Sequence, residues 1–333
     1  MGVALRDILA PYKRPVGWDG LCGTAAIDAH NALYQFLTII RQPDGTPLVD
    51  AEGRVTSHLS GLFFRTTKLL EKGVRPVYVY DGAPPSLKAR TIEARRGVRE
   101  EAGRQHVAAM ERGDAKEAYK QARASTRIDG EVIASSQRLL ELLGVPWVQA
   151  PSEGEAEAAR MAATGQVSYA VSQDYDALLF GAPELARNIT ISGRRRLHGR
   201  TITVEPERIR LAEVLEGLGI TREQLVEVGV LVGTDFNEGV RGVGPKTALK
   251  LVREGRFEET VAERLPDLDP APIVDFFLSP PARAPVALEW RAPDGEGLRA
   301  MLSDEYSFSV ERVNGALERL GVTAGQKTLD QWF

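Results

Sequence analysis

Carboxylates follow apolar runs at several places along this chain, and this recurrence restricts the folds that the chain can adopt. Four such segments are 25–28, 77–81, 151–155 and 171–176, and a fifth runs from 231 to 235. A carboxylate beside a hydrophobic core is costly unless another charge balances it. If these segments lie side by side, seven carboxylates meet at one place, and only bound cations make that arrangement tolerable. The pattern therefore predicts a divalent-metal site, and such sites usually act on phosphates.

Short apolar strands alternate with amphipathic helices through the first half of the chain. This alternation predicts an α/β fold with a mostly parallel, twisted sheet and helices on both faces. In such sheets ligands bind outside the carboxyl ends of the strands, which is where Asp28 and Asp81 fall. The expected strands are 24–28, 77–80, 145–148 and 168–171.

The helices that follow the strands carry further local signals. Ser152 and Glu155 have the spacing of a capping box at the start of a helix. Asp174 and Asp176 are two residues apart, so in an extended backbone their side chains point the same way. Later in the chain we expect a hairpin around the basic turn 194–196, one helix over 211–232, and irregular structure in the Pro- and Asp-rich stretch 266–298.

Oxygen ligands dominate the predicted metal site. The chain has one cysteine and four histidines, which disfavours zinc, whereas carboxylates suit Mg²⁺ or Mn²⁺. Seven acids suit two hard cations about 4 Å apart. Spacing alone does not separate a nuclease from a phosphatase. The predicted ligands are Asp28, Asp81, Glu153, Glu155, Asp174, Asp176 and Asp235.

The bulk composition is that of a globular protein without a membrane span. Hydrophobic residues make up 43% of 333 residues, no apolar run is long enough to cross a bilayer, and the lone Cys22 fits a reducing compartment. The net charge of −4 argues against unselective nucleic-acid binding by the whole surface. Residues 86–130 differ, with eleven Lys or Arg against seven acids, which is 11 − 7 = +4. This stretch is helical by composition but poorly amphipathic, so we expect an exposed excursion from the core.

A glycine-rich turn at 242–248 precedes a predicted helix. Glycines let backbone N–H groups approach a phosphate, and a helix N-terminus supplies partial positive charge. Lys246 adds a point charge, although the GxxxxG frame of a Walker motif is missing. The turn fits either a phosphate anchor or a tight connection between two helices without a ligand.

Taken in order, these motifs resemble the flap endonucleases, the structure-specific 5′ nucleases of DNA replication and repair, and most closely their archaeal branch. The resemblance covers almost the whole chain. Its motifs are Met1-Gly2-Val3, Ile27-Asp28-Ala29, Tyr34-Gln35-Phe36-Leu37, Thr56-Ser57-His58-Leu59, Tyr80-Asp81-Gly82, Ala150-Pro151-Ser152-Glu153, Asp174-Tyr175-Asp176, Gly233-Thr234-Asp235 and Gly242-Val243-Gly244-Pro245-Lys246.

The resemblance implies roles for residues in every part of the chain. It makes the seven acids a two-metal site, and it gives Lys88 and Arg95 contacts with the scissile phosphate, where they would act in catalysis. A helical arch at about 86–128 would thread a single-stranded 5′ end, and binding would weaken steeply with salt. A helix-two-turn-helix element at about 225–255 would grip duplex phosphates, with a monovalent cation held by carbonyls; Gly239 stands where some relatives have Ser. The implied DNA contacts are Gly2, Tyr34, Arg41, Gly242, Gly244, Lys246 and Thr247.

The C-terminal residues read as a separate recognition segment. Leu329 and Trp332 are three residues apart and share one face of a helical turn, with Phe333 adjacent. Together with Gln326 they resemble a sliding-clamp-binding box. We therefore expect a single nuclease core over 1–324 followed by a flexible clamp-binding tail over 325–333.

The resulting hypothesis is a structure-specific 5′-flap endonuclease with 5′–3′ exonuclease activity. It would hydrolyse a phosphodiester near a junction of single strand and duplex, with two Mg²⁺ or Mn²⁺ as cofactors. We expect it to act inside the cell, associated with the nucleoid during replication, and to be a monomer by itself. Two alternatives remain open. One is another 5′ nuclease of the superfamily, such as a nick exonuclease or junction resolvase. The other is a non-catalytic, clamp-bound adaptor for DNA structures.

Overall fold

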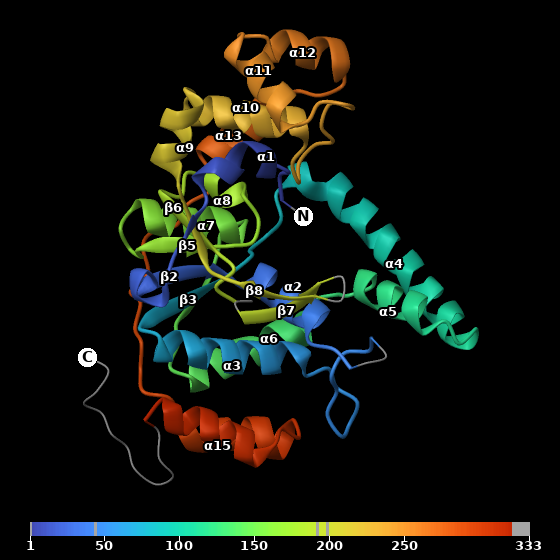
Figure 1. Cartoon of the computed structure of the whole chain (residues 1–333), viewed down its shortest axis with the longest axis vertical. Helices are drawn as coiled ribbons and strands as arrows, with labels where there is room; N and C mark the ends of the chain where they lie inside the picture. The colour runs from blue at the N-terminus through green and yellow to red at the C-terminus, as the bar shows by residue number, and fades with distance from the viewer. Residues whose placement is uncertain (1, 43–44, 191–192, 198–199, 322–333) are drawn as a thin grey trace. The chain divides into compact units, whose positions relative to one another are not determined.

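The computed structural model describes residues 2–42, 45–190, 193–197 and 200–321, and its chain is drawn in Figure 1. The chain divides into two compact units, each made of three segments. The first unit comprises 1–28, 79–92 and 149–285, and the second comprises 29–78, 93–148 and 286–333. Within the described residues, every helix is too short or too polar to span a membrane.

A seven-stranded sheet has all of its strands wholly or partly in the first unit, in the order β1-β9-β6-β5-β2-β3-β4. The pairs β2–β5 and β5–β6 are parallel, whereas β6–β9 and β1–β9 are antiparallel. This mixed, mostly parallel sheet confirms the predicted α/β class. The strands are β1 (Arg14–Pro15), β2 (Gly23–Asp28), β3 (Val74–Tyr80), β4 (Trp147–Gln149), β5 (Tyr169–Val171), β6 (Glu184–Arg187) and β9 (Glu207–Arg210).

The helices of the first unit pack on this sheet and on one another. Helix α7 contacts β2 and β5, α8 contacts β6, α9 contacts β9, and α10 packs against α11 and α13. A separate two-stranded sheet pairs β7 (Gly193–Leu197) with β8 (Arg200–Val204). The helices are α1 (Arg6–Leu9), α7 (Gly154–Ala163), α8 (Asp176–Leu179), α9 (Leu211–Leu218), α10 (Arg222–Val232), α11 (Pro245–Arg253), α12 (Phe257–Arg264) and α13 (Ala271–Leu278), with 3₁₀ turns at η1 (Ala10–Tyr12), η2 (Trp18–Leu21) and η3 (Ser86–Lys88).

Three expectations about the later elements of the chain were wrong. The predicted helix over 211–232 is two helices, because Gly219 adopts a left-handed conformation (φ 59°) and Thr221 begins a new helix with a capping box. The arginines of 194–196 lie within β7 rather than in a turn. The stretch 266–298 contains α13 and the start of α14, so it is irregular only in part.

The second unit is built mainly from helices. Helix α3 packs against α2, α6 and α15, and α14 packs against α6 and α15. Isolated antiparallel bridges join Arg41 to Pro47 and Val49 to Val55. The helices are α2 (Ala29–Ile39), α3 (Ser57–Glu71), α4 (Ala89–Glu111, which begins in the first unit), α5 (Ala115–Ala124), α6 (Gly130–Leu142), α14 (Gly295–Arg299), the π-helical turn η4 (Ala300–Glu305) and α15 (Val310–Arg319).

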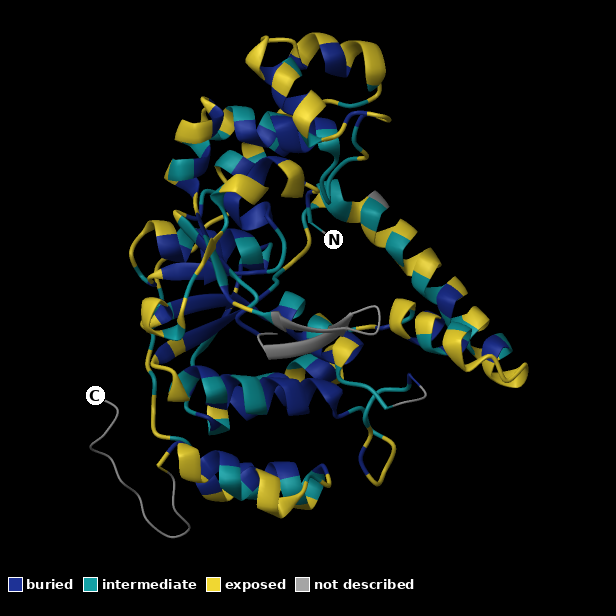
Figure 2. Cartoon of the chain, in the orientation of Figure 1, coloured by how far each residue is buried: buried dark blue, intermediate teal, exposed yellow. Residues whose placement is uncertain are grey.

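Helices α4 and α5 form the predicted basic excursion. Exposed residues run along both helices in Figure 2, and they include apolar side chains such as Val98, which is 66% exposed. Asp114 caps α5 by accepting a hydrogen bond from the Glu117 amide, and His106 Nδ1 lies 2.9 Å from the Ala118 carbonyl oxygen. The buried apolar residues of the two helices are all alanines: Ala102, Ala109, Ala118 and Ala122.

Candidate active site

The carboxyl ends of the parallel strands bring three of the predicted carboxylates to one edge of the sheet. Asp28 is the last residue of β2 and is buried, and Asp81 directly follows β3. Ile27 pairs with Val171, so the segment that carries Asp174 leaves β5 beside Asp28. The strand pattern thus predicted the position of this edge correctly.

Glu153 and Glu155 lie at the N-terminus of α7, where the helix dipole favours anions. The backbone amide of Gly154 donates to Asp81 Oδ1 at 2.7 Å, which ties this helix end to β3. The predicted capping box is absent. Glu153 is the N-cap residue, the buried Ser152 hydroxyl has no protein partner, and Glu155 accepts a hydrogen bond from the Ser172 hydroxyl instead.

Asp174 and Asp176 do not lie in an extended backbone, contrary to our expectation. Asp176 is the first residue of α8, and Tyr175 between them is its N-cap. Asp176 is 6% exposed and accepts a hydrogen bond from the Val3 amide at 2.7 Å. Gly2 packs so closely here that an added Cβ would collide with the Asp174 and Asp176 side chains. The N-terminal segment therefore lines the same site.

Asp235 reaches the site from a turn after α10 rather than from a strand. Gly233 begins the turn with φ 105°, and the Thr234 hydroxyl donates to Asn237 Oδ1 at 2.8 Å. Gly239 packs directly against the backbone of Val232 and Gly233, and a side chain there would overlap both. The turn is therefore closed by the contact of these two glycines.

Lys88 lies among the carboxylates. Its ammonium nitrogen is 2.5 Å from Glu153 Oε2 and 3.4 Å from Asp235 Oδ2, and the three side chains are each 14% exposed. Burial opposes its charge, but Glu153 and Asp235 outweigh burial and raise its pKa. In this structure Lys88 thus neutralises two predicted metal ligands.

Burial and mutual repulsion raise the pKa of three carboxyl groups in the cluster. Removal from water, with Asp235 and Asp174 adding to it, raises the pKa of Asp176 to about 7. Burial also raises the pKa of Glu155 well above its usual value, reinforced by Asp176, Asp28 and Asp174. The pKa of Glu153 is raised by burial, with Asp81 and Asp235 contributing.

These interactions link all seven carboxylates into one electrostatic cluster in the first unit. They do not yet form a coordination site: among the described residues, no group of three or more His, Cys, Asp or Glu side chains is arranged to hold a metal ion. Asp81 and Asp176 accept hydrogen bonds from backbone amides, and Glu153 and Asp235 face the Lys88 ammonium. Added cations would have to compete with these contacts.

The glycine-rich turn joins α10 to α11, as predicted. Gly242 has φ 82°, Gly244 is the N-cap of α11, and Pro245 follows at its first position. Lys246 and Thr247 are exposed in the first turn of α11, and neither Gly242 nor Gly244 has another atom near the place of a Cβ. The N–H groups of this helix end are therefore open to a ligand.

Three other predicted residues belong to the second unit. Arg95 lies on α4, and Tyr34 on α2 is 42% exposed. Arg41, also predicted to contact DNA, donates from its guanidinium to Leu37 O (2.9 Å), Gly45 O (2.7 Å) and Thr126 Oγ1 (2.5 Å). These bonds anchor the segment after α5 to the end of α2. The predicted clamp-binding residues Gln326, Leu329, Trp332 and Phe333 lie outside the described part of the chain.

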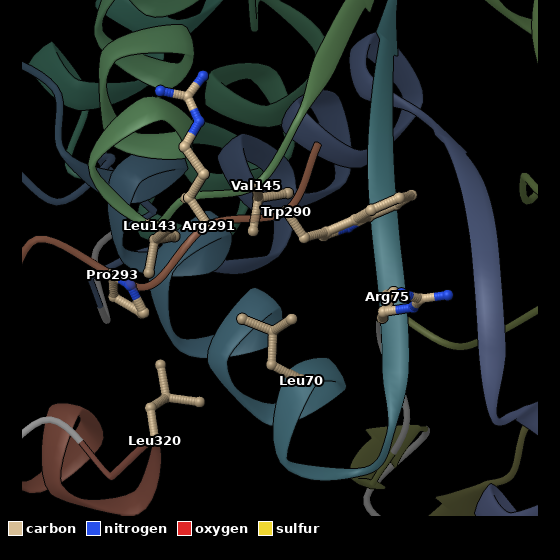
Figure 3. Close-up of a pocket in the computed structure, with 9 residues that line it drawn as sticks. Leu70, Arg75, Leu143, Val145, Trp290, Arg291, Pro293 and Leu320 are labelled. Carbon is tan, nitrogen blue, oxygen red and sulfur yellow. The ribbon is translucent and has the colours of Figure 1, made fainter. Parts of the chain in front are cut away.

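A cavity in the second unit is too small for a substrate (Figure 3). It measures about 30 Å³ and is lined by Leu70, Leu143, Trp290 and Leu320 among others. The Trp290 indole donates to the Pro76 carbonyl at 2.8 Å, and the Arg75 guanidinium lies 5.0 Å from the centre of its ring. A volume of this size holds about one water molecule.

Comparison with known proteins gives consistent matches over the whole chain. The model of the XPG N-terminal domain matches residues 1–102, and that of the XPG I-region matches residues 144–235. Flap endonuclease 1 of Methanosphaerula palustris is 65% identical over 333 residues, which is all of both chains.

Two solved structures resemble the fold closely. The flap endonuclease-1 from Methanococcus jannaschii is 38% identical with a TM-score of 0.77, covering 96% of this chain and 98% of that one. The catalytic core of Rad2 in complex with DNA substrate is 25% identical with a TM-score of 0.71, covering 95% and 99%.

Proposed function

Because this chain belongs to the flap endonuclease family, we propose that it is a structure-specific nuclease that hydrolyses a phosphodiester in DNA bearing a 5′ flap. The observation that best supports this proposal is the cluster of seven carboxylates at one end of the sheet. Three of these carboxyl groups have raised pKa values. Burial and mutual repulsion disfavour the ionised form of these carboxyl groups, and bound cations would stabilise that form.

Flap endonucleases are generally dependent on divalent metal ions, and the donor set fits such ions. All seven side chains offer oxygen, which Mg²⁺ and Mn²⁺ prefer. We infer that two ions are held by Asp28, Asp81, Glu153, Glu155, Asp174, Asp176 and Asp235. When bound, divalent ions supply Lewis-acid activation for phosphodiester hydrolysis.

Lys88 and Arg95 would act on the phosphate itself. Lys88 already lies beside Glu153 and Asp235 with its charge retained. Once added cations balance those carboxylates, its ammonium would be available to a phosphate oxygen, where it stabilises developing negative charge. Arg95, on α4, would offer a second, planar donor group to the same phosphate.

The remaining groups would hold the DNA. The open N-terminus of α11 with Lys246 and Thr247 suits duplex phosphates, and the carbonyls of Val240 and Val243 would hold a monovalent cation. Gly2, Tyr34 and Arg41 would contact the DNA near the cleavage point, and the basic helices at about 86–128 would guide the 5′ strand.

The C-terminal tail would bind a sliding clamp through Gln326, Leu329, Trp332 and Phe333, outside the nuclease core of residues 1–324. We further infer that the enzyme acts inside the cell, associated with the nucleoid during replication, and is a monomer by itself. Deleting 325–333 should abolish clamp binding in a pull-down while leaving cleavage of a free flap unchanged; equal clamp binding would contradict this assignment.

The decisive test is Asp176→Ala assayed on flap, nicked, bubble and four-way junction DNA, each with Mg²⁺ or EDTA. We expect the variant to lose cleavage by more than about 10³-fold while binding flap DNA nearly as well as the unchanged protein. Fastest cleavage of nicked or junction DNA would favour another 5′ nuclease. No Mg²⁺-dependent cleavage by the unchanged protein would favour a non-catalytic adaptor.

A further inference from the structure

We propose that Arg187, the last residue of β6, positions the segment that carries Asp174 and Asp176 and thereby sets the affinity of the cluster for metal ions. This inference rests on the proposed function, because it requires those two aspartates to be ligands. The sequence analysis predicted neither a role for Arg187 nor a strand at the position of β6.

Sheet register places Arg187 beside the segment in question. Strands β5 and β6 are parallel, and Ala186 pairs with Val171. Arg187 therefore lies at the point where the chain leaves β5 and enters residues 172–175. Its side chain is 13% exposed, so its hydrogen bonds are largely protected from water.

The guanidinium of Arg187 holds the backbone just before Asp174. Its Nε and Nη2 atoms both donate to the Gln173 carbonyl oxygen, at 3.2 and 2.7 Å. A carbonyl that accepts two hydrogen bonds from one charged group is fixed in direction. The peptide that joins Gln173 to Asp174 is thus held in one orientation.

The same guanidinium also holds the residue between the two aspartates. Its Nη1 atom donates to the Tyr175 hydroxyl at 2.7 Å, and its central carbon lies 4.2 Å from the centre of the Tyr175 ring. Tyr175 is 6% exposed and caps α8, whose first residue is Asp176. One side chain therefore holds the backbone just before Asp174 and the side chain of Tyr175, the residue between the two aspartates.

Arg187 is itself held by a counter-charge. Glu207, its partner across β6 and β9, accepts from Nη1 at 2.6 Å. Lys13 lies 3.4 Å from the same carboxylate and 5.3 Å from the centre of the Tyr175 ring. A lysine at 187 could not reproduce these contacts, because an ammonium group lacks the planar fork that reaches Gln173, Tyr175 and Glu207 together.

These bonds make Arg187 a positioning residue. Groups that orient metal ligands through hydrogen bonds, without contacting the metal themselves, typically contribute about 10- to 100-fold in metal affinity. We expect Arg187→Met to raise the Mg²⁺ concentration needed for half-maximal flap cleavage by about this factor and to weaken Mn²⁺ binding equally, measured by calorimetry. Cleavage at saturating Mg²⁺ should approach that of the unchanged protein.

Matched variants separate positioning from general damage. Arg210→Met is the control, because Arg210 is a half-exposed arginine on β9 that pairs with Glu184 and Glu213 instead. It should leave Mn²⁺ affinity unchanged. Arg187→Lys should recover only part of the affinity, and Tyr175→Phe should lose less than Arg187→Met because the bonds to Gln173 remain.

The outcomes distinguish this inference from the function on which it rests. If Arg187→Met binds Mn²⁺ as tightly as Arg210→Met while Asp176→Ala loses binding, the positioning role is wrong and the metal site stands. If Asp176→Ala also keeps full Mn²⁺ affinity, the metal site itself is wrong. Should Arg187→Met fail to unfold cooperatively on heating, Arg187→Lys and Tyr175→Phe decide by the same titration, and unchanged affinity in both would overturn the proposal.

Discussion

The carboxylate cluster of the first unit and the helices α4 and α5 of the second contain the same kinds of charged residue in opposite settings. In the cluster, burial raises the pKa of Glu155 and Asp176. On α4, the half-exposed Glu100 and the exposed Glu101 accept hydrogen bonds from Arg96 and Arg104, and these bonds lower their pKa values. Burial without a balancing cation therefore raises the pKa of a carboxylate, whereas an exposed carboxylate with an arginine partner stays ionised.

The difference has an energetic consequence. Exposed pairs such as Arg104 with Glu101, whose side chains are 70% and 50% exposed, are screened by solvent and add little to stability. Carboxylates crowded beside a core oppose folding unless cations arrive. The crowded carboxylates thus lower the stability of the protein, whereas the exposed ion pairs on α4 and α5 carry charge at almost no cost.

The largest expected effect comes from removing one charge from the cluster. Asp176→Asn keeps the oxygen that accepts from Val3 but cannot ionise. In EDTA near pH 8 we expect its free energy of unfolding to rise, on the order of 1 to 3 kcal/mol, because a repelled buried charge is gone. Cleavage should be lost at the same time. Denaturant unfolding measures the first effect, and a less stable variant would show that Asp176 is not repelled by its neighbours.

A smaller effect concerns the pH dependence of stabilisation by Mg²⁺. The pKa of Asp176 is raised to about 7 in the folded state, so the folded protein binds more protons than the unfolded chain between about pH 4 and pH 7. Below about pH 4 the Asp176 carboxyl is neutral in the folded protein, and its full contribution to the free energy of unfolding is present. This contribution is lost as the pH rises from about 4 to about 7. Added Mg²⁺ should therefore raise Tm little near pH 5 and more near pH 8. A rise in Tm that is equal at both pH values would rule out competition between protons and metal.

The smallest effect is expected on α4. Arg104→Gln breaks the exposed pair with Glu101. We expect Tm to change by less than about 2 °C, since such pairs contribute little in water. Arg160→Gln offers a comparison, because its partner Glu157 is 1% exposed and would remain as a buried, unpaired charge. Equal shifts in the two variants would show that burial does not separate these classes of ion pair.

How much of the fold the sequence predicts depends on the type of strand. Buried strands such as β2 and β5 are continuous apolar runs and were predicted almost to the residue. Strands β6 and β9 were missed, because Glu184-Leu185-Ala186-Arg187 and Glu207-Arg208-Ile209-Arg210 are short and carry two and three charged residues of four. Their charged residues pair with one another across the sheet, and sequence periodicity does not reveal such pairing.

The candidate site shows the same limit. Its carboxylates were identified because each follows an apolar run, but the groups that hold them come from elsewhere in the chain. Helix α13, within the stretch expected to be irregular, is an example. Its Phe277 packs against Phe236, next to Asp235, and against Phe180, which directly follows α8. Contacts between residues so far apart in sequence leave no local pattern to read.

The packing of Gly239 against Val232 and Gly233 limits how this protein can change by mutation. Any residue with a side chain at 239 must push back the backbone of 232–233, and that shift reaches Asp235 within two peptides. A serine introduced there would therefore shift the backbone that leads to Asp235. Variation at this position is therefore coupled to the other end of the same short turn, and neither glycine can be exchanged independently.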